Sequence, residues 1–118
     1  MIEHFKPSEF NCCCGSCYDM VNQDSLHRLD LAREMADVPF KINSSWRCEN
    51  NNTKVGGKST SAHLRGTAFD IACEHSTQRF GIVHALLDAG FTRVGIGSNF
   101  IHADDDSELP NEVMWLYK

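Results

Sequence analysis

Two segments of the chain place histidine and aspartate side chains where they could bind a metal ion. His63 lies seven residues before Asp70, and His102 lies further along in the apolar run 100–104. Imidazole nitrogens and carboxylate oxygens are ordinary ligands of zinc, and a catalytic zinc site holds three such ligands with a fourth position open to water. Together, these three residues could support metal-dependent hydrolysis.

The alternation of side chains along both segments indicates which of them share a face. Successive residues of a strand point to opposite faces. In a strand over 67–72, Phe69 would enter the core while Asp70, flanked by small alanines, would point the other way. In a strand over 100–104, His102 would likewise project away from its apolar neighbours. Both candidate ligands could therefore reach into a cleft.

The same side chains could also be satisfied without a metal. A buried carboxylate or imidazole that lacks a partner costs several kcal/mol. His102 could hydrogen-bond to Asp104 as a neutral histidine, and Asp70 could pair with an arginine, namely Arg47, Arg65 or Arg93. The residues alone leave both interpretations open.

The six cysteines raise a second question about metal binding. Cys14 and Cys17 form a Cys-x-x-Cys pair, which could be half of a structural zinc site, but a second half-site is not visible. A disulfide or redox role, or inert thiols in a tight loop, are the alternatives. The sequence does not decide the roles of the cysteines: Cys12, Cys13, Cys14, Cys17, Cys48 and Cys73.

Length and composition limit the class of protein. At 118 residues the chain suits one domain, and 42% hydrophobic residues suit a globular one. A net charge of -5 with scattered lysines and arginines argues against nucleic-acid binding. No apolar run approaches a membrane span, and the first residues do not resemble a signal peptide. We expect synthesis in the cytoplasm and no action outside the cell unless the protein is released.

Local patterns predict the elements that must position these residues. Apolar spacing predicts a helix over about 24–37, and a second helix is expected from an N-cap at Ser76 to a C-cap at Gly90. Strands are expected over 39–43, 67–72, 91–96 and 100–104, with a helical turn near 50–53 and a tight turn at 97–99. This order predicts an α+β domain in which helices pack on a small, mostly antiparallel sheet.

Residues outside these segments receive structural roles. The arm over 1–22 should belong to the single domain 1–118, anchored by Phe5 and Phe10. His84 shares a helix face with Phe80, Val83 and Leu87, and we expect that face to be buried. None of the other histidines, His4, His27 and His75, is expected to bind metal. Trp115 and Tyr117 should close the core or the edge of the sheet rather than stack on a ligand.

The motif Ser-x-His-x-x-Gly-x-Ala-x-Asp over 61–70, followed by Phe-Ile-His-Ala-Asp over 100–104, resembles the paired signature of the zinc D-alanyl-D-alanine carboxypeptidases. That family includes D,D-dipeptidases and phage L-alanyl-D-glutamate endopeptidases, and it shares its fold with the Hedgehog signalling domain. The segments 43–51 and 55–59 resemble its upstream motifs. The resemblance runs from about residue 5 to the C-terminus, and the short arm is similar to compact phage members.

The resemblance implies that His63, Asp70 and His102 bind zinc and leave a fourth position for water. Arg47 matches an arginine that grips the substrate carboxylate, and Ser61 matches a position that hydrogen-bonds near the substrate or the metal. The implied substrate is a peptidoglycan peptide, cut at D-Ala-D-Ala or at L-Ala-D-Glu. Release during phage lysis, or carriage in a virion, would bring such an enzyme to the cell wall.

One position departs from the family pattern. Many members carry an acidic general base three residues before the last zinc histidine, where this chain has Asn99. An amide cannot accept the proton. Asp104 is our first candidate for the base, although beside His102 it could also orient that ring; the other carboxylates are Glu49, Asp105 and Asp106. The alternative is a weak or inactive zinc-stabilised module that binds cell wall or protein.

Overall fold

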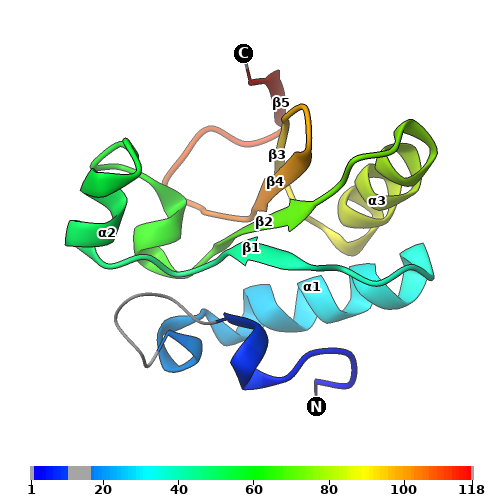
Figure 1. Cartoon of the computed structure of the whole chain (residues 1–118), viewed down its shortest axis with the longest axis horizontal. Helices are drawn as coiled ribbons and strands as arrows, with labels where there is room; N and C mark the ends of the chain where they lie inside the picture. The colour runs from blue at the N-terminus through cyan, green and yellow to red at the C-terminus, as the bar shows by residue number, and fades with distance from the viewer. Residues whose placement is uncertain (1, 11–16, 118) are drawn as a thin grey trace.

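A five-stranded sheet forms the centre of the molecule, and two helices pack against one of its faces (Figure 1). The computed structural model describes residues 2–10 and 17–117. The strand order is β1-β2-β4-β3-β5, and every neighbouring pair is antiparallel except β3 and β5. The predicted α+β architecture is therefore confirmed. The strands are β1 (Ile42–Ser44), β2 (Ala68–Ala72), β3 (Arg93–Ile96), β4 (Phe100–Asp104) and β5 (Val113–Leu116).

The two long helices have nearly the predicted bounds. Helix α1 (Gln23–Ala36) begins at Asn22, whose side chain accepts from the backbone N–H of Ser25, and α3 (Ser76–Ala89) ends at Gly90 with φ +108°. The first turn of α3 starts one residue earlier than predicted, because His75 is the N-cap. The short helical segments are η1 (Pro7–Phe10), η2 (Tyr18–Met20), α2 (Glu49–Lys54) and η3 (Ala62–Arg65).

Several strands differ from their predicted bounds: β2 begins one residue later and β3 two residues later than predicted. β1 begins at Ile42 and not at Pro39, since proline has no N–H to give to a ladder and the pairing with β2 is irregular between Ile42 and Ser44. β5 was not predicted as a strand. It forms the edge of the sheet beside β3, which agrees with the expectation that the C-terminal aromatic residues close that edge.

The core lies between the sheet and the helices α1 and α3. Phe69, Ile71 and Ile101 are fully buried, as their alternation along the strands predicts. The N-terminal arm also packs here, because the Phe10 ring lies 5.6 Å from that of Phe5 and 6.2 Å from that of Phe69. These contacts confirm Phe5 and Phe10 as anchors of the arm.

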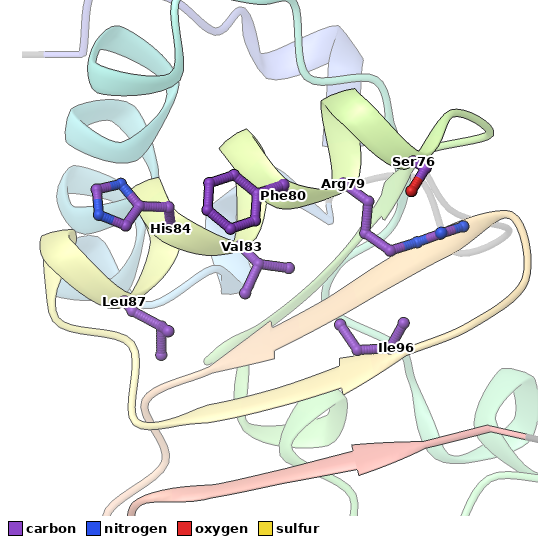
Figure 2. Close-up of a pocket in the computed structure, with 7 residues that line it drawn as sticks. All are labelled: Ser76, Arg79, Phe80, Val83, His84, Leu87 and Ile96. Atoms are coloured by element: carbon purple, nitrogen blue, oxygen red, sulfur yellow. The ribbon is translucent and has the colours of Figure 1, made fainter.

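The predicted buried face of α3 is wrong. Ile82, Ala85 and Leu86 face the core, whereas the Phe80 side chain is 78% exposed and His84 pairs with Asp88 at the surface. The packing of α3 against α1 decides which stripe is buried, and α3 is apolar on both sides. Figure 2 shows the outward-facing residues of α3, namely Phe80, Val83, His84 and Leu87. Together with Ile96 they border a hollow of about 400 Å³ on the helical side of the sheet.

Only part of the cysteine prediction can be compared with the structure. Cys12, Cys13 and Cys14 lie outside the described residues, whereas Cys17 is buried and disulfide-bonded. Cys48 caps α2 by accepting from the backbone N–H of Asn51, and Cys73 is a buried thiol. In the part of the chain that the structure describes, no helix has the length and apolar character that a bilayer crossing requires.

Candidate metal centre

One residue from each of the five strands forms a row across the sheet face that points away from the core. Asp70 pairs with Ser44 on one side and with His102 on the other, His102 pairs with Gly95, and Gly95 pairs with Trp115. Directly paired residues project to the same face. The row therefore brings Asp70 and His102, which are 32 positions apart in the sequence, side by side.

The third member of the cluster, His63, comes from the short helix η3. Ser61 caps this helix by accepting from the backbone N–H of His63. Three hydrogen bonds attach η3 to the segment 45–47: Ser45 O lies 2.6 Å from His63 Nδ1, Trp46 Nε1 donates to Leu64 O, and Arg47 N donates to His63 O. The imidazole is thus held at both its backbone and its ring.

The three side chains converge within metal-binding distance. One ligand atom from each of His63, Asp70 and His102 lies within 4.8 Å of the other two. Asp70 bridges the pair, with Oδ2 3.3 Å from His63 Nε2 and Oδ1 3.0 Å from His102 Nδ1. The His63 side chain is 2% exposed, and those of His102 and Asp70 are 8% and 19% exposed, so the cluster is shielded but reachable.

The hydrogen bonds on the outer ring nitrogens show why a cation fits. A backbone carbonyl accepts only, so Ser45 O takes the proton of His63 Nδ1, and a carboxylate accepts only, so Asp104 takes the proton of His102 Nε2 at 2.7 Å. In neutral rings this leaves lone pairs on His63 Nε2 and His102 Nδ1, both facing the Asp70 carboxylate. Three acceptors that face one another need a proton or a metal ion between them.

Without a metal, protons lie between these acceptors, and the pKa values of Asp70 and His102 reflect this. Burial alone would raise the pKa of Asp70, but hydrogen bonds and charge from His102 and His63 outweigh it and lower that pKa strongly. Burial alone would lower the pKa of His102, but hydrogen bonds with Asp104 and Asp70 raise it. A cation bound between these groups would replace the shared protons.

Comparison with protein families agrees with this geometry. The family described as Peptidase M15 matches residues 3–104, which is most of the chain and includes the whole cluster. The chain belongs to the peptidase M15 family. A comparison with curated proteins finds no significant match. Membership identifies the chain as a peptidase, and the cluster of His63, Asp70 and His102 is a possible metal site on this sheet face.

Asp104 contacts the His102 ring on the opposite side from Asp70. Its side chain is 1% exposed and both oxygens are occupied: Oδ2 accepts from His102 Nε2 at 2.7 Å and from Arg93 Nε at 3.3 Å, and Oδ1 accepts from the Asp106 backbone N–H at 3.2 Å and lies 3.0 Å from Arg93 Nε. It therefore contacts the ring nitrogen of His102 that faces away from Asp70. Of the two roles considered for Asp104, this arrangement favours orientation of His102 over that of general base.

The other carboxylates considered for the base lie elsewhere. Asp105 binds Ser25 and Arg28, Asp106 binds Arg65 and Thr67, and Glu49 begins α2 at the surface. Asn99 lies in the turn between β3 and β4, exposed to solvent. Among the described residues, the metal-binding cluster contains a single carboxylate, that of Asp70.

Arg47 and Ser61 both lie beside the cluster. Arg47 is half-buried, its Nε atom has no hydrogen-bond partner, and its pKa is lowered by burial although the charge of Asp70 opposes this shift. A buried guanidinium N–H without a partner can donate a hydrogen bond to an anion. Ser61 lines a pocket of about 230 Å³ that also borders His102. Ser61 thus both caps η3 and faces this pocket.

Sequence reasoning missed the aromatic residues of β5 at this site. The Trp115 ring lies 5.4 Å from the His102 ring and is covered on another side by the Arg93 guanidinium at 5.1 Å. Trp115 therefore packs on a candidate ligand in addition to closing the sheet edge. A signal was present, since Trp115 and Tyr117 alternate as strand residues do, but the partner strand could not be identified from the sequence.

Proposed function

We propose that this M15 peptidase is a zinc enzyme that hydrolyses the stem peptides of peptidoglycan, with His63, Asp70 and His102 as the zinc ligands. The observation that carries the proposal is the convergence of two imidazole lone pairs on one carboxylate, because each outer ring nitrogen donates its proton elsewhere. When bound, zinc would polarise a peptide carbonyl and activate water for attack.

The surrounding residues would prepare the site for that chemistry. Ser45 O and Asp104 hold the two rings in the tautomer that binds a metal, and Arg93 holds Asp104 in turn. We assign Asp104 this positioning role because neither of its oxygens is available to a water molecule. Such outer contacts commonly change metal affinity or activity by about 10- to 100-fold.

Arg47 would bind the substrate through a carboxylate. Its guanidinium can make two parallel hydrogen bonds to such a group, and its buried Nε has no other partner. Ser61, on the wall of the adjacent pocket, would hydrogen-bond the peptide backbone. A carboxylate next to the scissile bond occurs both in D-Ala-D-Ala termini and in the L-Ala-D-Glu linkage, so both bonds remain candidates.

A second candidate function is a zinc-stabilised module that binds cell-wall peptide or a protein without turnover. Asn99 favours it, because this residue occupies the family's base position and cannot accept a proton. The occupied oxygens of Asp104 favour it as well.

The deciding experiment compares zinc-loaded with chelator-treated protein. Each sample is incubated with purified peptidoglycan, with a pentapeptide ending in D-Ala-D-Ala and with an L-Ala-D-Glu peptide, and the products are weighed by mass spectrometry. Zinc-dependent cleavage supports the enzyme and identifies the bond. Zinc-dependent binding of intact peptide supports the module. If the protein neither cleaves nor binds any of these peptides, both functions are contradicted.

A further inference from the structure

The last strand of the sheet places two aromatic rings directly beside the candidate metal centre. Trp115 stands in the same row as Asp70, His102 and Gly95, and Tyr117 continues beyond it, where its backbone N–H donates to Ile96 O at 2.9 Å. The family match ends at residue 104, so this strand lies outside the matched region. The family comparison therefore does not extend to β5.

Gly95 is the reason that these rings can approach the site. It lies between His102 and Trp115 in the row, and its missing side chain leaves space above β3. A Cβ atom at position 95 would stand 2.5 Å from Tyr117 Cε2 and 2.6 Å from Trp115 Nε1, closer than real contacts allow. The two rings therefore lie over the glycine backbone and lean towards β4.

The two rings form a continuous wall along this side of the site. Trp115 contacts His102, while the Tyr117 ring lies 6.1 Å from Trp115 and 4.9 Å from Phe100. Trp115 is only half-buried and Tyr117 is 42% exposed, so both rings keep a face open to solvent. Rigid aromatic rings with an open face are well suited to bind a peptide.

The Tyr117 side chain lies close enough to Arg47 and Asp70 to interact electrostatically with both. A phenol that keeps its proton can donate it to an acceptor such as a carboxylate. Burial and the nearby carboxylates of Asp70 and Asp104 raise the pKa of Tyr117, which keeps that proton in place.

We propose that Trp115 and Tyr117 form the substrate-binding wall of this site, with Tyr117 donating a hydrogen bond to the same substrate carboxylate that Arg47 binds. This inference rests on the proposed peptidase function for the identity of the ligand, a short peptide with a free carboxylate. The Trp115 ring would pack against the residue that carries this carboxylate. Tyr117 and Trp115 are then specificity residues supplied by the C-terminal strand.

The test uses three variants that leave every candidate metal ligand in place. Tyr117→Phe removes only the hydroxyl, Trp115→Leu removes the ring platform, and Gly95→Ala inserts a methyl group that displaces both rings. Gly81→Ala is the matched control, since a Cβ at Gly81 meets nothing within 4 Å. For each protein we would measure zinc affinity by chelator competition, kcat and KM for the cleaved peptide, and the Kd of that peptide for the metal-free protein.

We expect Tyr117→Phe to raise KM and Kd about tenfold, as for a lost hydrogen bond to a charged group, with kcat and zinc affinity within about twofold of wild type. Trp115→Leu and Gly95→Ala should raise both constants as well, and Gly81→Ala should change neither. If the wild type cleaves peptide and Tyr117→Phe and Trp115→Leu leave KM and Kd unchanged, the wall is not part of the site and the inference fails.

A different result would separate the inference from the peptidase proposal. If the wild type cleaves none of the peptides but binds one, and the wall variants weaken that binding about tenfold, the peptidase function fails and the binding wall is supported. If the wild type neither cleaves nor binds any of these peptides, both proposals are overturned.

Discussion

Asp70 and His102 are paired directly across β2 and β4, and this pairing places Asp70 Oδ1 3.0 Å from His102 Nδ1. Because Asp104 accepts the proton of the other ring nitrogen, the contact needs either a second proton on His102 or a metal ion. We therefore expect the stability of the chain to depend on pH and on bound metal through this contact between Asp70 and His102.

The metal-free protein should lose stability as the pH rises above the unfolded pKa of His102, about 6.5. Hydrogen bonds raise the pKa of His102 in the fold, against the effect of burial. A raised pKa contributes stability that is fully present below the unfolded value, about 6.5, and is lost as the pH rises through the folded value. Zinc needs deprotonated ligands, so zinc-loaded protein should show no such loss.

Thermal unfolding from pH 5.5 to 9, with chelator-treated and zinc-loaded samples side by side, would check this expectation. His102→Gln should abolish the difference between the two samples. An identical pH dependence of unfolding with and without zinc in the wild type would contradict the proposed metal site.

Replacing Asp104 by asparagine should weaken zinc binding about 10- to 100-fold, because the negative partner of His102 Nε2 is lost. The measurement is zinc affinity by competition with a chromophoric chelator, together with the pH dependence of kcat. Asp88→Asn, on the exposed side of α3, is the control. Unchanged zinc affinity with a much lower kcat and a lost acidic limb in the pH profile would instead restore Asp104 as the general base.

Arg47→Ala should raise KM for the peptide about 10- to 100-fold, as for the loss of a charge-assisted pair, while zinc affinity stays near that of wild type. Arg47→Lys should recover only part of the loss, since lysine cannot make the planar two-point contact. Steady-state kinetics on the cleaved peptide would show this, with Arg33→Ala in α1 as control. Equal KM values for Arg47→Ala and wild type would exclude Arg47 from substrate binding.

Gly66→Ala should destabilise the fold by more than about 2 kcal/mol, since it combines left-handed strain with a backbone clash. Gly66 ends η3 with φ +74°, and a Cβ there would stand 2.2 Å from Met20 O. Gly56→Ala has a similar φ of +77° but open space, and should cost about 1 kcal/mol. Denaturant unfolding would compare them, and equal losses would show that the contact with Met20 contributes nothing.

The candidate ligands and most strands could be predicted from the sequence because both depend on local patterns. Asp70 and His102 interrupt apolar runs at positions that alternate away from the core, and Phe69 and Ile101 fill the core as expected. The helix α1 and the C-cap at Gly90 follow from spacing and from backbone conformation in the same way. These features need only a few neighbouring residues to be recognised.

Features that depend on contacts between distant segments could not be predicted. α3 is apolar on two sides, so only its packing against α1 decides that Ile82 is buried and Phe80 is exposed. The position of β5 depends on its parallel pairing with β3, and no local pattern in the sequence identifies β3 as its partner.

The sequence by itself therefore determined the candidate metal ligands, the strands that carry Asp70 and His102, and the α+β class, because side-chain alternation and ligand chemistry are local properties. Only the tertiary structure decided which ring nitrogens face Asp70, that Asp104 binds His102 Nε2, and how Gly95 admits Trp115 beside the cluster. These depend on cross-strand register, which is set by the packing of the whole sheet against its helices.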